Sequence, residues 1–68
     1  MKKSILTKRE KEIFEMLIQN KTTKEIAEDL KISEKTVRNH ISNAMQKLGV
    51  KGRAGAVVEL LKLKEISL

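Results

Sequence analysis

The sequence predicts an all-α fold, and three observations support this prediction. The 68 residues include no proline and only three glycines, and 40% of them are hydrophobic, a composition typical of helices. No segment alternates between β-branched apolar and polar residues as a strand would. Helical spacing of apolar residues and capping signals recur along the chain instead. A chain this short forms one small domain, so we expect residues 1–68 to fold as a single unit of four helices.

The first predicted helix begins at Lys8, because residues 7–10 have the spacing of a capping box. Residues 1–6 precede it as a short basic lead, and the mixed-charge run at residues 8–12 is typical of a solvated face. Asn20 is expected to end the helix in a left-handed conformation. The inward residues are Ile13, Phe14, Leu17 and Ile18, of which the only aromatic is expected to be the largest core residue.

A second, short helix is predicted after another capping box at residues 22–25. Its inward residues are Ile26, Ala27 and Leu30. A three-residue connection, with Ile32 at the corner, leads to the next cap, which is the pattern of a helix-turn-helix. Lys31 stands where such turns often carry glycine, so the turn either avoids a positive φ or accepts a strain of about 1 kcal/mol.

The clearest helix of the sequence spans residues 34–48, between a Ser33 cap and a glycine at position 49. At about 100° per residue its apolar residues form a narrow stripe, which is the expected buried side. The opposite side carries residues that can hydrogen-bond to base edges. The stripe consists of Val37, Ile41, Ala44 and Leu48, and the polar side of Lys35, Arg38, Asn39, Ser42, Asn43 and Gln46.

The last predicted helix covers about residues 54–63, and its apolar residues spread over more than half of its circumference. Val58, Leu61 and Leu63 cannot all face the core that Val57 and Leu60 face. The surplus predicts a partner that covers this face. As an alternative, Ile66 and Leu68 fold back over this face.

The positive charge is concentrated in one third of the chain. Residues 31–53 carry six Lys and Arg against one acidic residue, and so hold nearly all of the net charge of +6. This distribution favours a polyanion-binding surface over a merely solvated basic face. A reader of single-stranded RNA is less favoured, because such proteins stack bases on aromatic side chains and Phe14 is the only aromatic residue.

Several classes of function are not expected. The chain has no cysteine, which excludes disulfides and Cys-based zinc sites. His40 is the only histidine, and no Ser or acid is spaced to form a catalytic group with it; we expect a structural role, with a phosphate contact as the lesser alternative. No enzymatic activity, metal, cofactor or small-molecule ligand is therefore expected. The absence of a long apolar run or signal-type segment predicts a cytoplasmic protein without a membrane partner.

Four segments together resemble the signature of LuxR-type helix-turn-helix domains. They are Leu6-Thr7-x-Arg9-Glu10, Lys24-Glu25-Ile26-Ala27-x-x-Leu30-x-Ile32-Ser33, Thr36-Val37-x-x-His40 and Lys47-Leu48-Gly49-Val50-x-x-Arg53. The resemblance implies a four-helix DNA-binding domain with a helix-turn-helix at about residues 23–42, dimerisation through the last helix, and control of transcription. The match is especially close to the small stand-alone regulators of spore-forming bacteria, which implies control of sporulation genes.

By position, the resemblance also implies roles for individual residues. Ser42 departs from the basic residue that many members carry there, and Ala54-Gly55 departs from the usual polar pair. The implied base-reading residues are Arg38, Asn39 and Ser42; those near phosphates are Thr22, Thr23, Lys35, Thr36 and Lys47; and the outward residues Val58, Leu61 and Leu63 are expected to form the dimer contact.

Two other interpretations compete with a stand-alone regulator. The chain could be the isolated output domain of a larger response regulator, although the initial Met and a complete fold favour the stand-alone protein. It could also be an adaptor that binds RNA polymerase through the surplus apolar face of its last helix. Binding to duplex DNA separates the adaptor from the other two.

Overall fold

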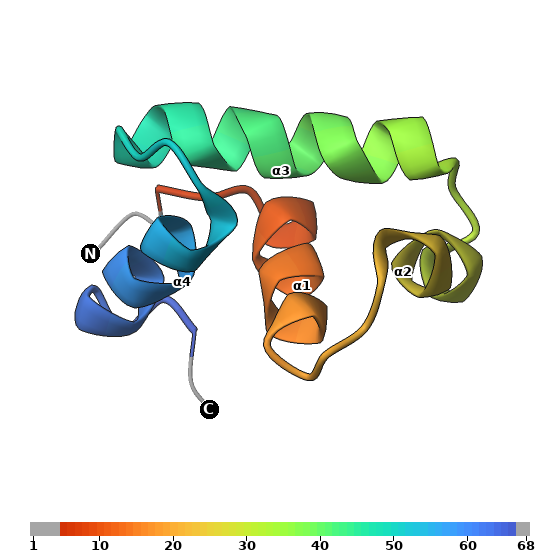
Figure 1. Cartoon of the computed structure of the whole chain (residues 1–68), viewed down its shortest axis with the longest axis horizontal. Helices are drawn as coiled ribbons and strands as arrows, with labels where there is room; N and C mark the ends of the chain where they lie inside the picture. Colours follow the sequence, from red (N-terminus) through yellow and green to blue (C-terminus); the bar gives the residue numbers. More distant parts are fainter. Residues whose placement is uncertain (1–4, 67–68) are drawn as a thin grey trace.

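Four helices make up residues 5–66, the part of the chain that the computed structural model describes (Figure 1). They are α1 (Lys8–Leu17), α2 (Thr23–Leu30), α3 (Glu34–Leu48) and α4 (Arg53–Lys62). No strand occurs among these residues, and the all-α prediction is confirmed. The basic residues at the start of the lead and the contribution expected of Leu68 lie outside the described residues.

Helix α3 lies along one long side of the molecule, and the other three helices lie on the opposite side of it (Figure 1). It packs against each of them: α2 near its start, α1 at its middle and α4 near its end. Because all its neighbours lie on one side, the other side of α3 is left free along its length. The core beneath it is formed by Leu6, Ile13, Phe14, Ile26, Ala27, Val37, Ile41, Ala44, Ala56, Leu60 and Ile66.

The predicted N-terminal caps are present on the first three helices. In α1, Thr7 Oγ1 accepts from the Glu10 backbone at 3.1 Å and the Glu10 carboxylate accepts from the Thr7 backbone at 2.9 Å. Thr22 and Glu25 form the same reciprocal pair at the start of α2. Ser33 Oγ caps α3 by accepting from the Thr36 backbone at 3.0 Å. These bonds satisfy backbone donors that a helix start otherwise leaves unpaired.

All four helices are followed by a residue with positive φ: Asn20 at 67°, Lys31 at 59°, Gly49 at 68° and Lys64 at 57°. At each, the next residue's N–H donates back across the last turn, as Ile32 does to the Ala27 carbonyl at 3.0 Å, which is the pattern of a Schellman cap. Asn20 takes the expected conformation, although α1 itself ends earlier, at Leu17. Of the two conformations left open for the turn after α2, the chain adopts the one with positive φ.

Both ends of the described chain contribute to the core. The lead contributes Leu6 to the core, with 5% of its surface exposed, and the tail contributes Ile66, with 4% exposed. Helix α4 begins one residue earlier than predicted, at Arg53, and its buried residues are Ala56 and Leu60, whereas Val57 is only half-buried. The tail therefore does fold back, as the alternative interpretation held, but it leaves part of the apolar face of α4 uncovered.

Candidate nucleic-acid interface

The free side of α3 presents the polar residues that the sequence placed there. Lys35, Arg38, Asn39, Ser42, Asn43 and Gln46 are all exposed. The apolar stripe faces the opposite way, with Val37, Ile41 and Ala44 buried and Leu48 packed at the edge of the core. The three predicted base-reading residues thus lie together on a single exposed face, within about 100° of helix circumference.

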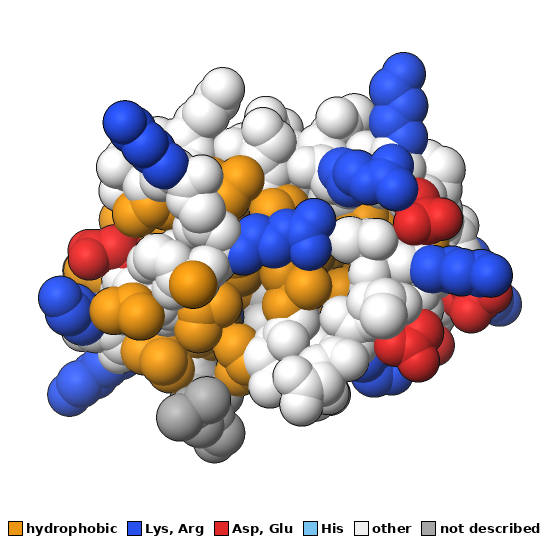
Figure 2. Space-filling model, viewed as in Figure 1, with side chains coloured by type: hydrophobic (Ala, Val, Ile, Leu, Met, Phe, Trp, Pro, Cys, Tyr) orange, Lys and Arg blue, Asp and Glu red, His pale blue; other side chains and the backbone are white. Residues whose placement is uncertain are grey.

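Basic side chains project near the start of α3. Figure 2 shows Lys and Arg side chains at the upper right of the molecule, where α2 meets the N-terminal end of α3. Lys35 and Arg38 of this region are exposed. A positive surface around the free side of α3 attracts polyanions.

Arg38 is held by an acidic residue that the sequence analysis did not single out. Its Nη2 atom donates to Glu34 Oε2 at 3.3 Å, four residues earlier in the same helix. The same carboxylate oxygen accepts from the Thr23 hydroxyl of α2 at 3.2 Å. Two predicted contact residues are therefore joined through Glu34. The i, i+4 spacing of opposite charges was visible in the sequence and is the signal that could have revealed it.

The remaining threonines lie at the two helix starts that meet in the helix-turn-helix. Thr22 is exposed at the start of α2 and Thr36 is half-buried in the first turn of α3. The Thr36 hydroxyl is hydrogen-bonded to Ser33 Oγ at 2.9 Å. Helix N-termini carry partial positive charge and backbone donors, so both starts can approach a phosphate.

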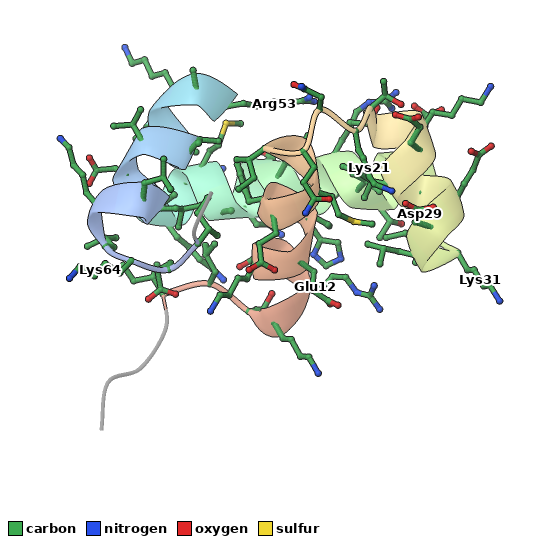
Figure 3. All side chains as sticks on the ribbon, turned by 90° about the horizontal axis from the view of Figure 1, so that it is seen from below. Glu12, Lys21, Asp29, Lys31, Arg53 and Lys64 are labelled. Carbon is green, nitrogen blue, oxygen red and sulfur yellow. The ribbon has the colours of Figure 1, made fainter. Side chains whose placement is uncertain are left out.

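The turn before α2 is fixed by a surface ion pair. Lys21, directly before the Thr22 cap, is paired with Asp29 in the last turn of α2, and the two side chains meet in Figure 3. The Asp29 carboxylate raises the pKa of Lys21 through a hydrogen bond and its charge. The pair links the residue before α2 to the last turn of that helix.

Lys47 lies apart from the other predicted phosphate contacts and is engaged within the domain. Its Nζ atom donates to Glu10 Oε1 at 2.7 Å, and only 4% of the Glu10 side chain is exposed. The interpretation of residues 8–12 as a solvated face is therefore wrong at Glu10, which caps α1 and joins it to α3. Burial by itself favours the neutral acid, but the Lys47 ammonium and the hydrogen bonds from Thr7 outweigh it and lower the pKa of Glu10.

His40 is half-buried on α3, at the border between its buried and free sides. Within residues 5–66, no three His, Cys, Asp or Glu side chains come together as a metal site requires. No helix in that range is both long and apolar enough to cross a bilayer.

A second exposed surface lies on α4. Val58 and Leu63 are 50% and 40% exposed, and Leu61 is half-buried against the core. Figure 2 shows hydrophobic side chains gathered at the lower left, over α4. The three residues predicted for the dimer contact are thus at least partly accessible, at the end of the molecule opposite α2 (Figure 1).

Comparison with known proteins gives consistent matches. Residues 4–60 match the family described as bacterial regulatory proteins, luxR family. The chain is 74% identical to the spore germination protein GerE of Bacillus subtilis (strain 168), over 97% of this chain and 89% of that protein. The solved structure of the transcription factor GerE superposes with a TM-score of 0.93 at 62% identity, covering 96% of this chain and 97% of that one. The transcriptional regulatory protein DegU of Brevibacillus brevis is 48% identical over 85% of this chain, which spans only 25% of that longer protein.

Proposed function

Because the chain belongs to the LuxR family of bacterial regulatory proteins, we propose that it regulates transcription as a homodimer whose α3 helix enters the major groove of duplex DNA. The observation that carries this proposal is the free side of α3, which is polar over its whole length and bordered by basic residues. The major groove is wide enough to admit one α-helix.

Within the groove, Arg38 and Asn39 are the proposed base readers, and Ser42 is a third contact near them. Arginine pairs bidentately with guanine and asparagine with adenine. Lys35 and the helix starts at Thr22 and Thr36 are the proposed contacts to the phosphate backbone, with Thr23 as a further contact beside them. Phosphate contacts position a protein on the duplex, whereas base contacts carry the sequence preference.

The homodimer is proposed from the exposed part of α4. Val58 and Leu63 expose apolar surface at α4, which does not lie on the side of α3 proposed to face DNA. A second copy that covers this surface would bring a second α3 helix to the DNA, so that each α3 binds one half-site. The two half-sites should then be centred about one helical turn, ~10 base pairs, or a multiple apart. RNA polymerase is a further proposed partner, because regulators bound beside a promoter lie within its reach.

The similarity to a spore germination protein supports sporulation genes as the targets, and we propose that the protein acts in the cytoplasm, where duplex DNA is accessible to it in bacteria. The direction of regulation depends on where the bound site lies relative to a promoter.

The test begins with selection of bound duplexes from a random library, followed by measurement of affinity for the selected and a shuffled duplex. Arg38→Ala or Asn39→Ala should cost about 1–3 kcal/mol on the selected duplex and much less on the shuffled one. Thermal stability should hardly change, because both side chains are exposed.

Val37→Ala is the matched control on the same helix. Val37 is fully buried, so its truncation should lower the free energy of unfolding by about 1 kcal/mol or more and leave the base preference as it is. If Arg38→Ala and Asn39→Ala both keep the wild-type affinity and preference, α3 does not read the bases and the proposal fails.

A further inference from the structure

Glu34 is the only acidic residue within residues 31–53, and it lies at the start of the helix proposed to enter DNA. An acidic side chain at this place repels phosphates, so its presence opposes the proposed function. Its contacts account for it. The Oε2 atom accepts from Arg38 Nη2 at 3.3 Å and from Thr23 Oγ1 at 3.2 Å.

Resting on the proposed function, we infer that Glu34 is a positioning residue that sets specificity: it holds Arg38 away from phosphates and toward a base edge. In the free protein the Arg38 side chain is 58% exposed and the Glu34 side chain 41%, so both remain within reach of a ligand. Arginine has five N–H donors, and the contact with Glu34 leaves enough of them to bind a guanine.

Capping alone does not explain the residue. The start of α3 is already capped by Ser33, which accepts from the Thr36 backbone. A carboxylate near a helix start does interact favourably with the helix dipole, but that effect is independent of the identity of residue 38. The contact with Arg38 is what makes the inference testable.

Thr23 fixes the carboxylate from the other helix of the motif. Its hydroxyl donates to the same Oε2 atom, and Thr23 is the first residue of α2. Glu34 is therefore oriented by α2 and α3 together, and Arg38 is oriented in turn. A pre-oriented arginine loses less conformational freedom when it binds a base.

The expected consequence is discrimination between DNA sequences. On a non-cognate duplex, a phosphate contact draws Arg38 away from Glu34, and the carboxylate, left with Thr23 as its partner, then faces the phosphate backbone. On the cognate duplex, Arg38 binds its base and keeps Glu34 as a neighbour. Glu34 should thus lower the affinity for all DNA, and lower it most for non-cognate DNA.

The test compares Glu34→Gln, Glu34→Asp and Glu28→Gln with the wild type on the selected and shuffled duplexes defined above. Glu34→Gln keeps the shape and removes the charge, whereas Glu34→Asp keeps the charge and shortens the reach to Arg38. Glu28→Gln is the matched control, since it removes the same charge from an exposed position on α2 without touching Arg38.

With Glu34→Gln, affinity for the shuffled duplex should rise roughly tenfold and affinity for the selected duplex much less. The resulting loss of discrimination is within the range of a single base contact. The salt slope on the shuffled duplex should steepen by about 0.9, because Arg38 then neutralises one more phosphate. Glu34→Asp should also lose discrimination. Glu28→Gln should raise both affinities by one common factor.

Arg38→Ala supplies the decisive background. In that background, Glu34→Gln should no longer change the ratio of the two affinities. If it still does, or if Glu34→Gln acts on both duplexes equally as Glu28→Gln does, Glu34 is merely a negative charge and the inference is overturned.

Failure of the proposed function gives a different result. If Arg38→Ala leaves the wild-type preference intact, or the wild type has no preference, base reading by Arg38 fails and this inference fails with it. If Arg38→Ala removes the preference and Glu34→Gln does not, the proposed function stands and only the inference fails. Thermal unfolding of every variant checks that it is folded.

Discussion

Replacing Lys47 by methionine should destabilise the domain by about 2 kcal/mol at pH 7. The change leaves the carboxylate of Glu10 buried, with 4% of its side chain exposed, and without its ammonium partner at 2.7 Å. Removing one member of a buried ion pair costs about 3–5 kcal/mol. We lower that figure because the Lys47 side chain is 37% exposed, so water replaces part of the interaction, and because the Thr7 N–H still donates to Glu10. The expected fall in Tm is about 10 °C for a domain of this size.

The pH dependence of this effect follows from the lowered pKa of Glu10. A carboxyl group whose pKa is lower in the folded than in the unfolded state stabilises the fold above its unfolded pKa, for which 4.5 is the ordinary value. That contribution is lost as the pH falls through the folded pKa. In Lys47→Met the lowering effect of the ammonium is removed while burial remains, so the pKa of Glu10 is higher than in the wild type. The stability gap between wild type and variant should therefore be widest near neutral pH and close as the pH falls below about 4.5.

Urea unfolding followed by circular dichroism between pH 3 and 7 measures the gap. Lys35→Met is the matched control, because Lys35 is an exposed lysine on the same helix; it should change stability by about 0.5 kcal/mol or less. Glu10→Gln combined with Lys47→Met should recover much of the loss, since no charge is then left buried. Equal stability of Lys47→Met and Lys35→Met at pH 7 would refute the ion pair, and a gap independent of pH would refute the charge on Glu10.

Three further predictions concern the caps, α4 and the dimer. Lys31→Gly should raise the free energy of unfolding by about 1 kcal/mol in urea titrations, because a side chain at φ 59° is strained; no gain would mean that the turn relaxes in solution. Gly55→Ala should raise it by about 0.5–1 kcal/mol, because alanine favours the helix more than glycine does and its Cβ would make an ordinary contact with Val50 at 3.6 Å. Gly49→Ala, at φ +68°, should lower it by about 1 kcal/mol. An equal response at both glycines would contradict the conformational argument. Val58→Asp should give a folded monomer in sedimentation velocity, since Val58 is 50% exposed on α4; a wild type that is itself monomeric at high concentration would exclude the dimer.

Local signals predicted the backbone of this domain well. Both capping boxes, the Ser33 cap and the Gly49 turn form as predicted, because each depends on side chains within a few residues of the backbone groups that they satisfy. The division of α3 into a buried stripe and a free polar side also follows from spacing alone. The family resemblance added which of the polar residues to test.

Contacts between distant segments were less predictable. Nothing near Glu10 in the sequence indicates that Lys47, 37 residues later, will reach its carboxylate. Leu6 was not singled out as a core residue and Ile66 was expected to fold back only as an alternative, yet both are buried, because the core of so short a chain has to be completed from its ends. On α4, small Ala56 is fully buried while the larger Val57 packs only at the edge of the core, since the orientation of a helix against its neighbours is not defined by spacing.

The position of α3 against all three other helices has a thermodynamic consequence. A ligand that binds only the folded chain stabilises it by mass action, by about 2.7 kcal/mol at a concentration 100 times its Kd. Because the helix proposed to bind DNA is also the one against which the other three pack, that stabilisation should reach every helix, as slower amide hydrogen exchange throughout the domain. A variant with a weakened core would then be unfolded when free and folded on its DNA site, and its apparent affinity would fall although no contact with DNA had changed.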